Sequence, residues 1–482
     1  MRELSFDQKE DIGLQWVLDE LHPASACGRE RLRALRPAAA EEKPALEREL
    51  DDLQRLVDAG EEHRKLYGQL AHAFSQVKDL RRTFERCREM SLSDVELFEI
   101  KGYLLQLERL SPLMACLEDE LGVQDAALLP CGDALRLLDI ENRGTATFFI
   151  SSRYSEELAA VRREKKRIEE EIRTVGTAGD ALQAERSAVI AREEREEEAV
   201  RRRLSQELRP WLNDMAENLE RIARLDLLLE KARLARAWGA VRPKLGGDTL
   251  RFEGLISPYV ARAVQEKGGV FTPVDICLSR GATVITGANM GGKSVALRAV
   301  LLNVLLAHMG FFVFARRAEI PLFDEAILIA EDEQSVRRGL SSFGAEIAAL
   351  GDALHRMEGR FCLLVLDEFA RGTNPEEGRR IVRALVRYLS EKGSIALLAT
   401  HYDGTARDAC AHYQVAGLRD VDPARLADEL RASGGGFEAI RRHMDYRLLP
   451  AGALDECPRS ALIICRMLLP QEDLMRAIEE NY

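Results

Sequence analysis

The sequence feature that most constrains the fold is the run Gly-Ala-Asn-Met-Gly-Gly-Lys-Ser at residues 287–294, which fits the pattern G-x-x-x-x-G-K-[ST]. It follows a short β-branched run that ends at Thr286 and precedes a helical pattern over residues 295–309. In this context the glycines let backbone N–H groups curl around phosphates, and the helix N-terminus adds a partial positive charge. The pattern therefore predicts that Lys293 reaches the β- and γ-phosphates of a nucleotide and that Ser294 holds Mg²⁺.

A second motif lies at residues 361–368, where the run Phe-Cys-Leu-Leu-Val-Leu-Asp-Glu predicts a buried strand that ends in two acids. We expect Asp367 to bind the same Mg²⁺ and Glu368 to orient or deprotonate the attacking water. The simpler alternative is that two acids cap a buried strand, and the upstream phosphate loop argues against it. A third strand ends at Thr400. His401 after it either senses the γ-phosphate through a hydrogen bond or is an ordinary residue at a strand end.

The sequence pattern changes near residue 240. Before that point apolar residues recur every three or four positions, and after it short apolar runs alternate with helical segments. Pro243 and the glycines at 246–247 mark the boundary. We expect an all-α core and lever domain over residues 1–240, an α/β domain with a mostly parallel sheet over 241–444, and a helical tail over 445–482.

Two apolar stripes at helical spacing flank residues 175–200. The first includes Leu158, Val161 and Ile168, and the second runs from Leu204 to Ile222. We interpret the two as a long antiparallel arm that reverses direction between them. The alternative is an ordinary helical bundle with a solvated, charged outer face.

Composition limits the compartment and the class of protein. The nine cysteines are scattered without a C-x-x-C pair, and neither they nor the eight histidines show zinc-site spacing. The N-terminus lacks the basic and apolar regions of a signal peptide, and the apolar stretch 301–315 is too short to span a bilayer. We therefore expect a cytoplasmic protein with reduced thiols and no membrane partner. The net charge of −12 argues against a general nucleic-acid coat protein but leaves room for a local basic patch.

At the nucleotide motifs the sequence resembles the MutS family of ATPases, which belong to the ABC-type class. The resemblance rests on I-T-G-A-N-M-G-G-K-S at 285–294, L-D-E-F-A-R-G-T-N-P-E-E-G at 366–378 and A-T-H-Y at 399–402. The segment E-D-E-Q-S-V-R-R-G-L-S-S-F at 331–343 is similar to one in the subfamily that lacks mismatch-reading domains. The resemblance is strong over about residues 250–475 and weaker toward the N-terminus.

The resemblance implies an ABC-type P-loop ATPase domain that uses ATP and Mg²⁺. Its phosphate loop would consist of Gly287, Asn289, Gly291, Gly292, Lys293 and Ser294. Asp367 and Glu368 would serve Mg²⁺ and water, and His401 would be the switch histidine. Ser341 and Ser342 would reach the γ-phosphate bound by the other subunit of a homodimer or a MutS-like heterodimer. The tail from 445 would supply dimerisation helices, with a helical lid on its own domain as the alternative.

Departures from the family limit how far its function can be carried over. We expect no mismatch-reading domain before the helical core and no nuclease-like domain after the tail. Residues 175–200, the expected arm tip, hold three basic and seven acidic residues, and this excess of acid repels DNA phosphates. Smaller departures are Val274 where the family usually has Asn, Ala288 for Pro and Ala370 for Gly. We expect the change at Ala370 to be mild because alanine is small.

Three functions remain open at this point. The first is a dimeric ATPase of the mismatch-repair family whose nucleotide state moves helical arms on DNA without reading mismatches. For it, the arginines of residues 81–88 either contact a DNA backbone or form a solvated helix face. The second is a protein-remodelling ATPase with a protein client, such as a reactivating chaperone of a cobalamin-dependent aminomutase. The third, a scaffold with an inactive nucleotide site, is disfavoured because Lys293, Asp367 and Glu368 are all present.

Overall fold

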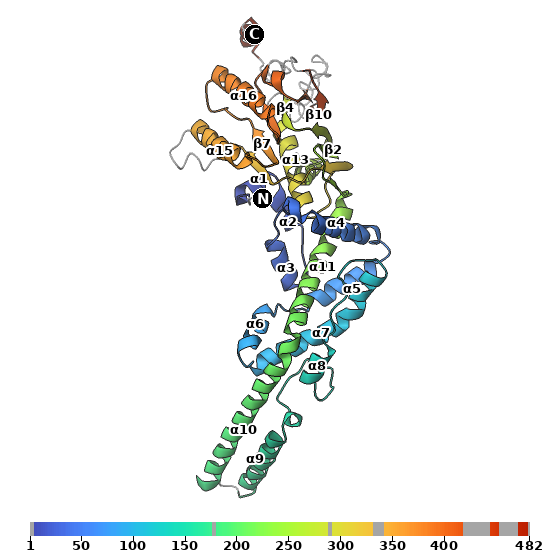
Figure 1. Cartoon of the computed structure of the whole chain (residues 1–482), viewed down its shortest axis with the longest axis vertical. Helices are drawn as coiled ribbons and strands as arrows, with labels where there is room; N and C mark the ends of the chain where they lie inside the picture. The colour runs from blue at the N-terminus through green and yellow to red at the C-terminus, as the bar shows by residue number, and fades with distance from the viewer. Residues whose placement is uncertain are drawn as a thin grey trace. The chain divides into compact units, whose positions relative to one another are not determined.

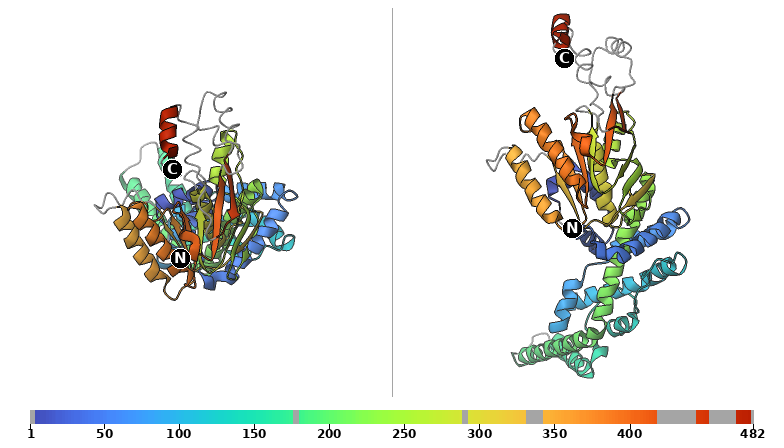
Figure 2. Two further views of the ribbon diagram at one scale, coloured as in Figure 1. Left: turned by 90° about the horizontal axis from the view of Figure 1, so that it is seen from above. Right: turned by 45° about the horizontal axis from the view of Figure 1, so that its top comes forward.

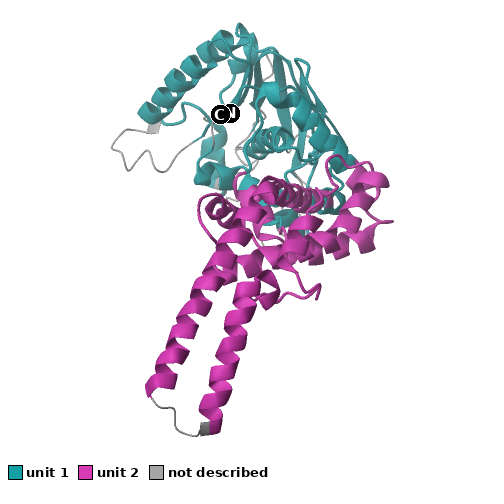
Figure 3. Ribbon diagram, turned by 60° about the horizontal axis from the view of Figure 1, so that its bottom comes forward, with its two compact units in different colours: residues 1–21, 35–54, 233–482 teal, residues 22–34, 55–232 magenta. Residues whose placement is uncertain are grey.

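The computed structural model describes residues 4–175, 180–287, 292–330, 342–417, 444–452 and 471–480. The chain forms two compact units, which Figure 3 shows in different colours. Residues 22–34 and 55–232 make up a helical unit, and residues 1–21, 35–54 and 233–482 make up a sheet unit. The division into domains at residues 240 and 444 stays a prediction.

The helical unit contains no strand among its described residues, so the first half of the chain is helical as predicted. Its helices lying wholly within the unit are α3 (Ala26–Arg33), α5 (Arg64–Ser75), α6 (Arg81–Glu89), α7 (Asp94–Asp119), α8 (Gly132–Leu138), α9 (Glu156–Val175) and α10 (Asp180–Leu208), with the 3₁₀ turns η2 (Ser152–Tyr154) and η3 (Arg209–Trp211). Helices α4 (Lys43–Asp58) and α11 (Leu212–Trp238) contribute residues to both units.

Helices α9 and α10 lie side by side and run antiparallel (Figure 1). The direction follows from their ion pairs, because Arg162 of α9 pairs with Glu197 of α10 whereas Glu169, further along α9, pairs with the earlier Arg186. Buried apolar side chains form the seam between the two helices. These are Val161, Ile168 and Val189, with Ile172 packed against them. The pair lies where the sequence predicts the arm.

The sheet unit contains two sheets. The larger has the order β10-β9-β4-β8-β7-β6 and the smaller β1-β5-β2-β3. Their strands are β1 (Lys244–Leu245), β2 (Leu250–Leu255), β3 (Val274–Leu278), β4 (Gly281–Thr286), β5 (Arg317–Ile320), β6 (Glu325–Ile329), β7 (Cys362–Asp367), β8 (Ile395–Thr400), β9 (Ala411–Gly417) and β10 (Asp445–Pro450). All pairs of the larger sheet are parallel except β9 with β10, whereas the smaller sheet mixes both directions. The predicted mostly parallel arrangement therefore holds for the larger sheet.

The central strands of the larger sheet are buried on both faces, as expected of a parallel sheet that helices cover. Alternate residues such as Val284, Leu364 and Leu398 pack into one core with residues of α15 (Ser342–Met357) and α16 (Pro375–Ser390). Figure 2 shows these two helices side by side along one flank of the sheet. Helix α13 (Lys293–His308), which contacts β7 and β8, is buried almost all round, as its continuous apolar sequence requires.

The remaining elements of the sheet unit are short. They are α1 (Phe6–Asp11), α2 (Leu14–Asp19), α12 (Pro258–Glu266), α20 (Glu472–Glu480) and the 3₁₀ turns η1 (Ala40–Glu42) and η4 (Thr405–Asp408). Trp16 of α2 meets Trp238, the last residue of α11, edge to face with ring centroids 5.8 Å apart. The guanidinium of Arg262 lies 5.8 Å from the Trp16 ring centroid and also pairs with Glu20. None of the helices that the structure describes has both the length and the apolar character needed to cross a bilayer.

The prediction that the tail is helical from residue 445 onward is wrong for its first residues. Residues Asp445–Pro450 form strand β10, which pairs with β9 and covers that edge of the larger sheet. The strand forms because its backbone satisfies the hydrogen-bonding groups of β9, which would otherwise be a free edge. Further along the tail, the described helix α20 spans Glu472–Glu480, and residues 453–470 lie outside the described residues.

Candidate functional site

Two glycines frame the start of the site. Gly287 directly follows β4 with φ +144°, and Gly292 caps the N-terminus of α13 with φ +84°. A Cβ atom at Gly292 would lie 3.0 Å from Cδ1 of Tyr446, a residue of β10. Both the backbone conformation and the close approach of Tyr446 therefore require glycine at position 292.

Lys293 is buried, and its side chain turns back toward the strand that precedes it. Its ammonium group donates a hydrogen bond to the carbonyl oxygen of Gly287 at 2.9 Å. The same Nζ lies 3.5 Å from a carboxylate oxygen of Glu368. Because a buried ammonium needs acceptors or counter-charges, an anionic phosphate is a suitable ligand for this position.

Ser294 and Asp367 meet at the ends of different elements. The Ser294 hydroxyl donates to Oδ1 of Asp367 at 2.8 Å, and the guanidinium of Arg298 lies 3.7 Å from Oδ2. Burial raises the pKa of Asp367, and the hydrogen bond from Ser294 opposes that shift. A hydroxyl and a carboxylate in contact are hard oxygen donors of the kind that Mg²⁺ binds, so these two residues fit the predicted metal ligands.

Glu368 follows β7 in a left-handed backbone conformation with φ +50°. Its N–H donates to the carbonyl oxygen of Ala399 in β8 at 3.0 Å. Its carboxylate lies within 3.5 Å of Lys293 and 3.4 Å of Arg371. A residue other than glycine costs free energy when its backbone is left-handed, and such strained residues are concentrated at functional sites.

His401 directly follows β8, and its ring centroid lies 4.3 Å from that of Tyr402. Burial lowers the pKa of His401, while the negative charge of Glu368 acts in the opposite direction. The imidazole is therefore neutral near pH 7, and it shares an electrostatic environment with Glu368.

Strand register explains why these residues meet. Thr286 of β4 is paired with Thr400 of β8, and Asp367 of β7 is paired with Ala399 of β8. The carboxyl ends of the three strands thus lie level at one edge of the sheet, which is where ligands bind in open α/β folds. The residues that the structure brings together there are Lys293, Ser294, Asp367, Glu368 and His401.

Part of the predicted site lies outside the described residues. Asn289 and Gly291 fall in the gap at 288–291, and Ser341 falls in the gap at 331–341. Ser342 is described as the first residue of α15 but its side chain is not. A complete phosphate loop is therefore not shown, and the roles of these four residues stay predictions.

The sequence argument about Ala370 considered the size of the side chain but not the backbone. The residue has φ +65°, so the replacement of a family glycine by alanine also bears on backbone conformation. Its N–H donates to Oε2 of Glu346 at 2.7 Å, and its carbonyl oxygen accepts from the Tyr402 hydroxyl at 3.0 Å. The family motif contained the signal, because a glycine at this place already indicates a positive φ.

His412 of β9 is a further residue that no sequence pattern indicated. Its Nε2 lies 2.7 Å from the hydroxyl of Thr286, and its Nδ1 lies 2.7 Å from the carbonyl oxygen of Gly452. Both ring nitrogens are thus engaged, one at the end of β4 and the other just after β10. This histidine fixes the strand end from which the phosphate loop departs.

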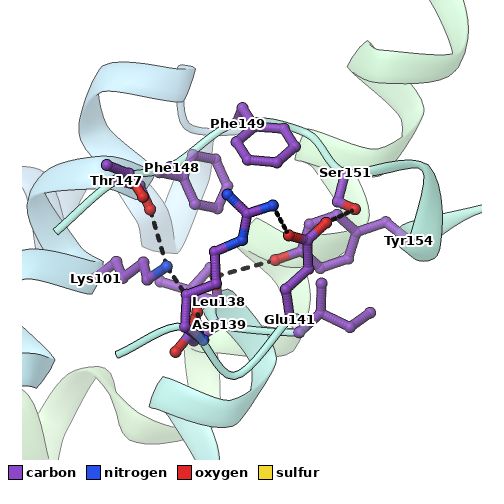
Figure 4. A pocket seen from close by; sticks show the side chains of 11 residues that line it. Lys101, Leu138, Asp139, Glu141, Thr147, Phe148, Phe149, Ser151 and Tyr154 are labelled. Atoms are coloured by element: carbon purple, nitrogen blue, oxygen red, sulfur yellow. Dashed lines mark hydrogen bonds and ion pairs between the residues drawn. The ribbon is translucent and has the colours of Figure 1, made fainter. Parts of the chain in front are cut away.

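The helical unit contains a pocket lined by none of these motif residues (Figure 4). Its charged groups satisfy one another, since Lys101 donates to Asp139 at 2.8 Å and to the carbonyl oxygen of Thr147 at 2.9 Å. Glu141 accepts from Ser151 at 2.6 Å and pairs with Arg143. The network anchors the segment after α8 to α7. The charged residues that line the pocket therefore have a structural role.

Comparisons with known proteins agree with the motifs. Residues 283–422 match the family model of MutS domain V. The chain is 34% identical over 221 residues to the DNA mismatch repair protein MutS of Natronomonas pharaonis, an overlap of 45% of this chain and 26% of the relative. It is 31% identical over 219 residues to the endonuclease MutS2 of Leuconostoc mesenteroides and 28% identical over 302 residues to that of Shouchella clausii. These matches span 27% and 37% of the two relatives, so the chain corresponds to only part of their length.

Proposed function

We propose that this chain is a Mg²⁺-dependent ATPase, because residues 283–422 match the family model of MutS domain V, in agreement with the resemblance to the MutS family. The observation that carries the proposal is the meeting of Lys293, Ser294, Asp367 and Glu368 at one sheet edge. We infer the nucleotide from the family, since MutS domain V is a P-loop ATPase domain that uses ATP and Mg²⁺.

The roles follow from the contacts. Lys293, now held by Gly287 and Glu368, would exchange those contacts for phosphate oxygens. Ser294 and Asp367 would hold Mg²⁺, which supplies positive charge next to the phosphates. Glu368 would orient the attacking water and accept its proton, and neutral His401 would hydrogen-bond near the γ-phosphate.

We further propose that two copies act together. In the family pattern Ser341 and Ser342 approach a nucleotide bound by a second subunit, and a dimer would complete each site in this way. Nucleotide binding would favour the closed dimer because the contacts of Ser341 and Ser342 with the second copy's nucleotide form only there. The helical arm α9–α10 would then report the nucleotide state to a client.

The client that we favour is DNA, in mismatch repair or a related process, because the relatives above are named for DNA mismatch repair or as endonucleases. We do not assign the DNA contact to α6, because two of its arginines form ion pairs within the protein. Arg81 contacts Asp79 and Glu30, and Arg86 pairs with Glu96. The comparisons give no support to the protein-remodelling alternative.

The test is hydrolysis of ATP by the purified chain with and without Mg²⁺. We expect Lys293→Ala and Glu368→Gln each to lower kcat by about 100-fold or more. Glu368→Gln should still bind nucleotide, because the substituted carboxylate serves water and not the phosphates. Wild-type protein without Mg²⁺-dependent hydrolysis would contradict the proposal.

Two further measurements test the assembly and the client. Sedimentation of Glu368→Gln with ATP and Mg²⁺ should show a dimer, and a monomer under these conditions would refute the paired site. Fluorescence anisotropy with linear, branched and mismatched duplexes at about 0.1 M salt tests DNA binding. The absence of binding at micromolar protein would refute the DNA client.

A further inference from the structure

We propose that Glu346 is a positioning residue that couples helix α15 to the backbone carrying Glu368. The inference rests on the proposed ATPase function. It adds that a contact made by α15 determines the position of Glu368, the residue proposed to orient water. Glu346 belongs to none of the motifs that the sequence analysis singled out for nucleotide chemistry.

The contact that carries the inference is a single hydrogen bond between two elements. Oε2 of Glu346, on α15, accepts the N–H of Ala370 at 2.7 Å. The carbonyl oxygen of the same residue accepts from the hydroxyl of Tyr402 at 3.0 Å. Both polar groups of the Ala370 backbone are therefore fixed from outside the segment that follows β7.

These two hydrogen bonds hold a strained segment. Glu368 and Ala370 have φ +50° and +65°, so two non-glycine residues within three positions are left-handed. Each such residue costs about 1–2 kcal/mol, and the conformation persists only where the surroundings determine it. Ala370 is fully buried and Phe369 nearly so, which leaves the segment no solvent-exposed alternative.

The packing of helix α16 also leaves little room for the segment 368–370 to relax. Gly378 of α16 is so close that a Cβ there would lie 2.5 Å from the Tyr402 hydroxyl and 2.9 Å from the carbonyl oxygen of Ala370. The segment is thus enclosed by α15, α16 and the residues after β8. A displacement of Glu346 has to be absorbed by the 368–370 backbone.

Helix α15 can deliver such a displacement. It begins at Ser342, about one turn before Glu346, and Ser342 is predicted to approach the nucleotide of a second copy. Because a hydrogen-bonded helix moves as a rigid body over one turn, docking of the second copy at Ser342 would shift Glu346 and hence Glu368. Hydrolysis would in this way depend on the closed dimer.

The experiment compares three changes at Glu346 with a matched control. Glu346→Leu removes the acceptor, and Glu346→Asp keeps the charge but is too short to keep the hydrogen bond in place. Glu346→Gln keeps an oxygen that accepts the N–H of Ala370. Asp352→Ala removes an exposed acid from the same helix and serves as the control.

We expect Glu346→Leu and Glu346→Asp to lower kcat for ATP by about tenfold or more, with KM changed by less than about threefold. Glu346→Gln and Asp352→Ala should stay within about twofold of the wild type. Glu346→Asp remains informative if the leucine variant does not fold. Unchanged kcat in Glu346→Asp, or an equal loss in Glu346→Gln, would overturn the inference.

Two readouts separate this inference from the proposed function. Hydrogen exchange at the Ala370 amide should be about tenfold faster in Glu346→Asp than in wild type, and unchanged exchange would overturn the inference. Addition of Ala370→Gly to Glu346→Asp should recover kcat by about threefold or more, because glycine adopts this φ without strain. Additive effects would show that the two residues act separately and would also overturn it. If wild-type protein does not hydrolyse ATP, the proposed function fails first, and this inference fails with it.

Discussion

Helices α10 and α13 are held by different forces. In α13, 13 of 16 residues are buried, including the polar residues Asn303 and His308. In α10 only five of 29 residues are buried, and its contact with α9 combines a thin apolar seam with ion pairs. Apolar burial places α13 firmly, whereas α10 depends on charges that water and salt weaken.

The largest effect should come from a cavity in α13. Leu302 is fully buried, so Leu302→Ala should lower the free energy of unfolding of the sheet unit by about 2–5 kcal/mol. Thermal unfolding followed by circular dichroism measures the change. Leu182→Ala in α10, at a half-buried position, is the matched control and should cost less than about 1 kcal/mol. Equal losses at both sites would remove the distinction between the helices.

A pH effect should follow from the end of α13. Burial lowers the pKa of His308, whose Nε2 accepts the N–H of Phe323 at 3.3 Å. As the pH falls below 6.5, the ordinary pKa, the unfolded chain takes up a proton that the folded chain resists. Stability therefore falls toward acid pH, by up to about 1.4 kcal/mol per pH unit from this group.

The check is the unfolding midpoint at pH 7.5 and 5.5 in wild type and His308→Gln. The variant should lose less stability between the two conditions, although half-buried His401 contributes a slope of the same sign in both proteins. Replacement of His355, which is 84% exposed, should leave the slope unchanged. The same slope in wild type and His308→Gln would contradict the assignment.

A strained backbone persists only where the surroundings are well packed, as in the sheet unit. Substitution of Ala370 tests whether such strain is present there. Ala370→Gly relieves a left-handed alanine, worth about 1–2 kcal/mol, but adds about 0.4–1 kcal/mol of unfolded-state entropy. We expect a net gain of about 0.5–1 kcal/mol in the unfolding free energy, measured by chemical denaturation. A loss of stability would contradict this expectation and show that the packing of the buried Ala370 methyl group outweighs the relief of backbone strain.

The smallest effect should come from the arm. Burial acts to raise the pKa of Glu193, but hydrogen bonds from Lys165 and Arg162 outweigh it and the pKa is lowered. The pair therefore stabilises the arm above the ordinary pKa of Glu and is lost as the pH falls through the lowered value. Glu193→Gln should cost less than about 1 kcal/mol, and less still at high salt.

Hydrogen exchange within α9 and α10 measures this change, because it is local. Amides of the arm should exchange a few-fold faster in Glu193→Gln while those of α13 stay unchanged. Glu194→Gln, which removes an exposed neighbour, should have no effect. Faster exchange in α13 as well would show that the arm and the sheet unit unfold together.

The fold and site were predictable where local pattern and burial agree. Continuous apolar runs identified β4, β7 and β8, and parallel strands end at one edge, so Lys293, Ser294 and Asp367 could be placed together. Strand β10 was missed because its six residues mix polar and apolar types at a partly exposed edge, and its pairing depends on distant residues of β9. Glu346 was missed because its contact is with the backbone of Ala370, 24 positions away, and a backbone contact of this kind leaves no sequence motif.

The edge-to-face contact of Trp16 with Trp238 has a practical consequence. Indole rings 5.8 Å apart and inclined by 84° couple their electronic transitions, so the pair should give an exciton couplet in the ultraviolet. The sequence has only three tryptophans, so the background from Trp211 is small. The contact offers a label-free spectroscopic signal for whether the N-terminal helices stay attached while nucleotide turns over.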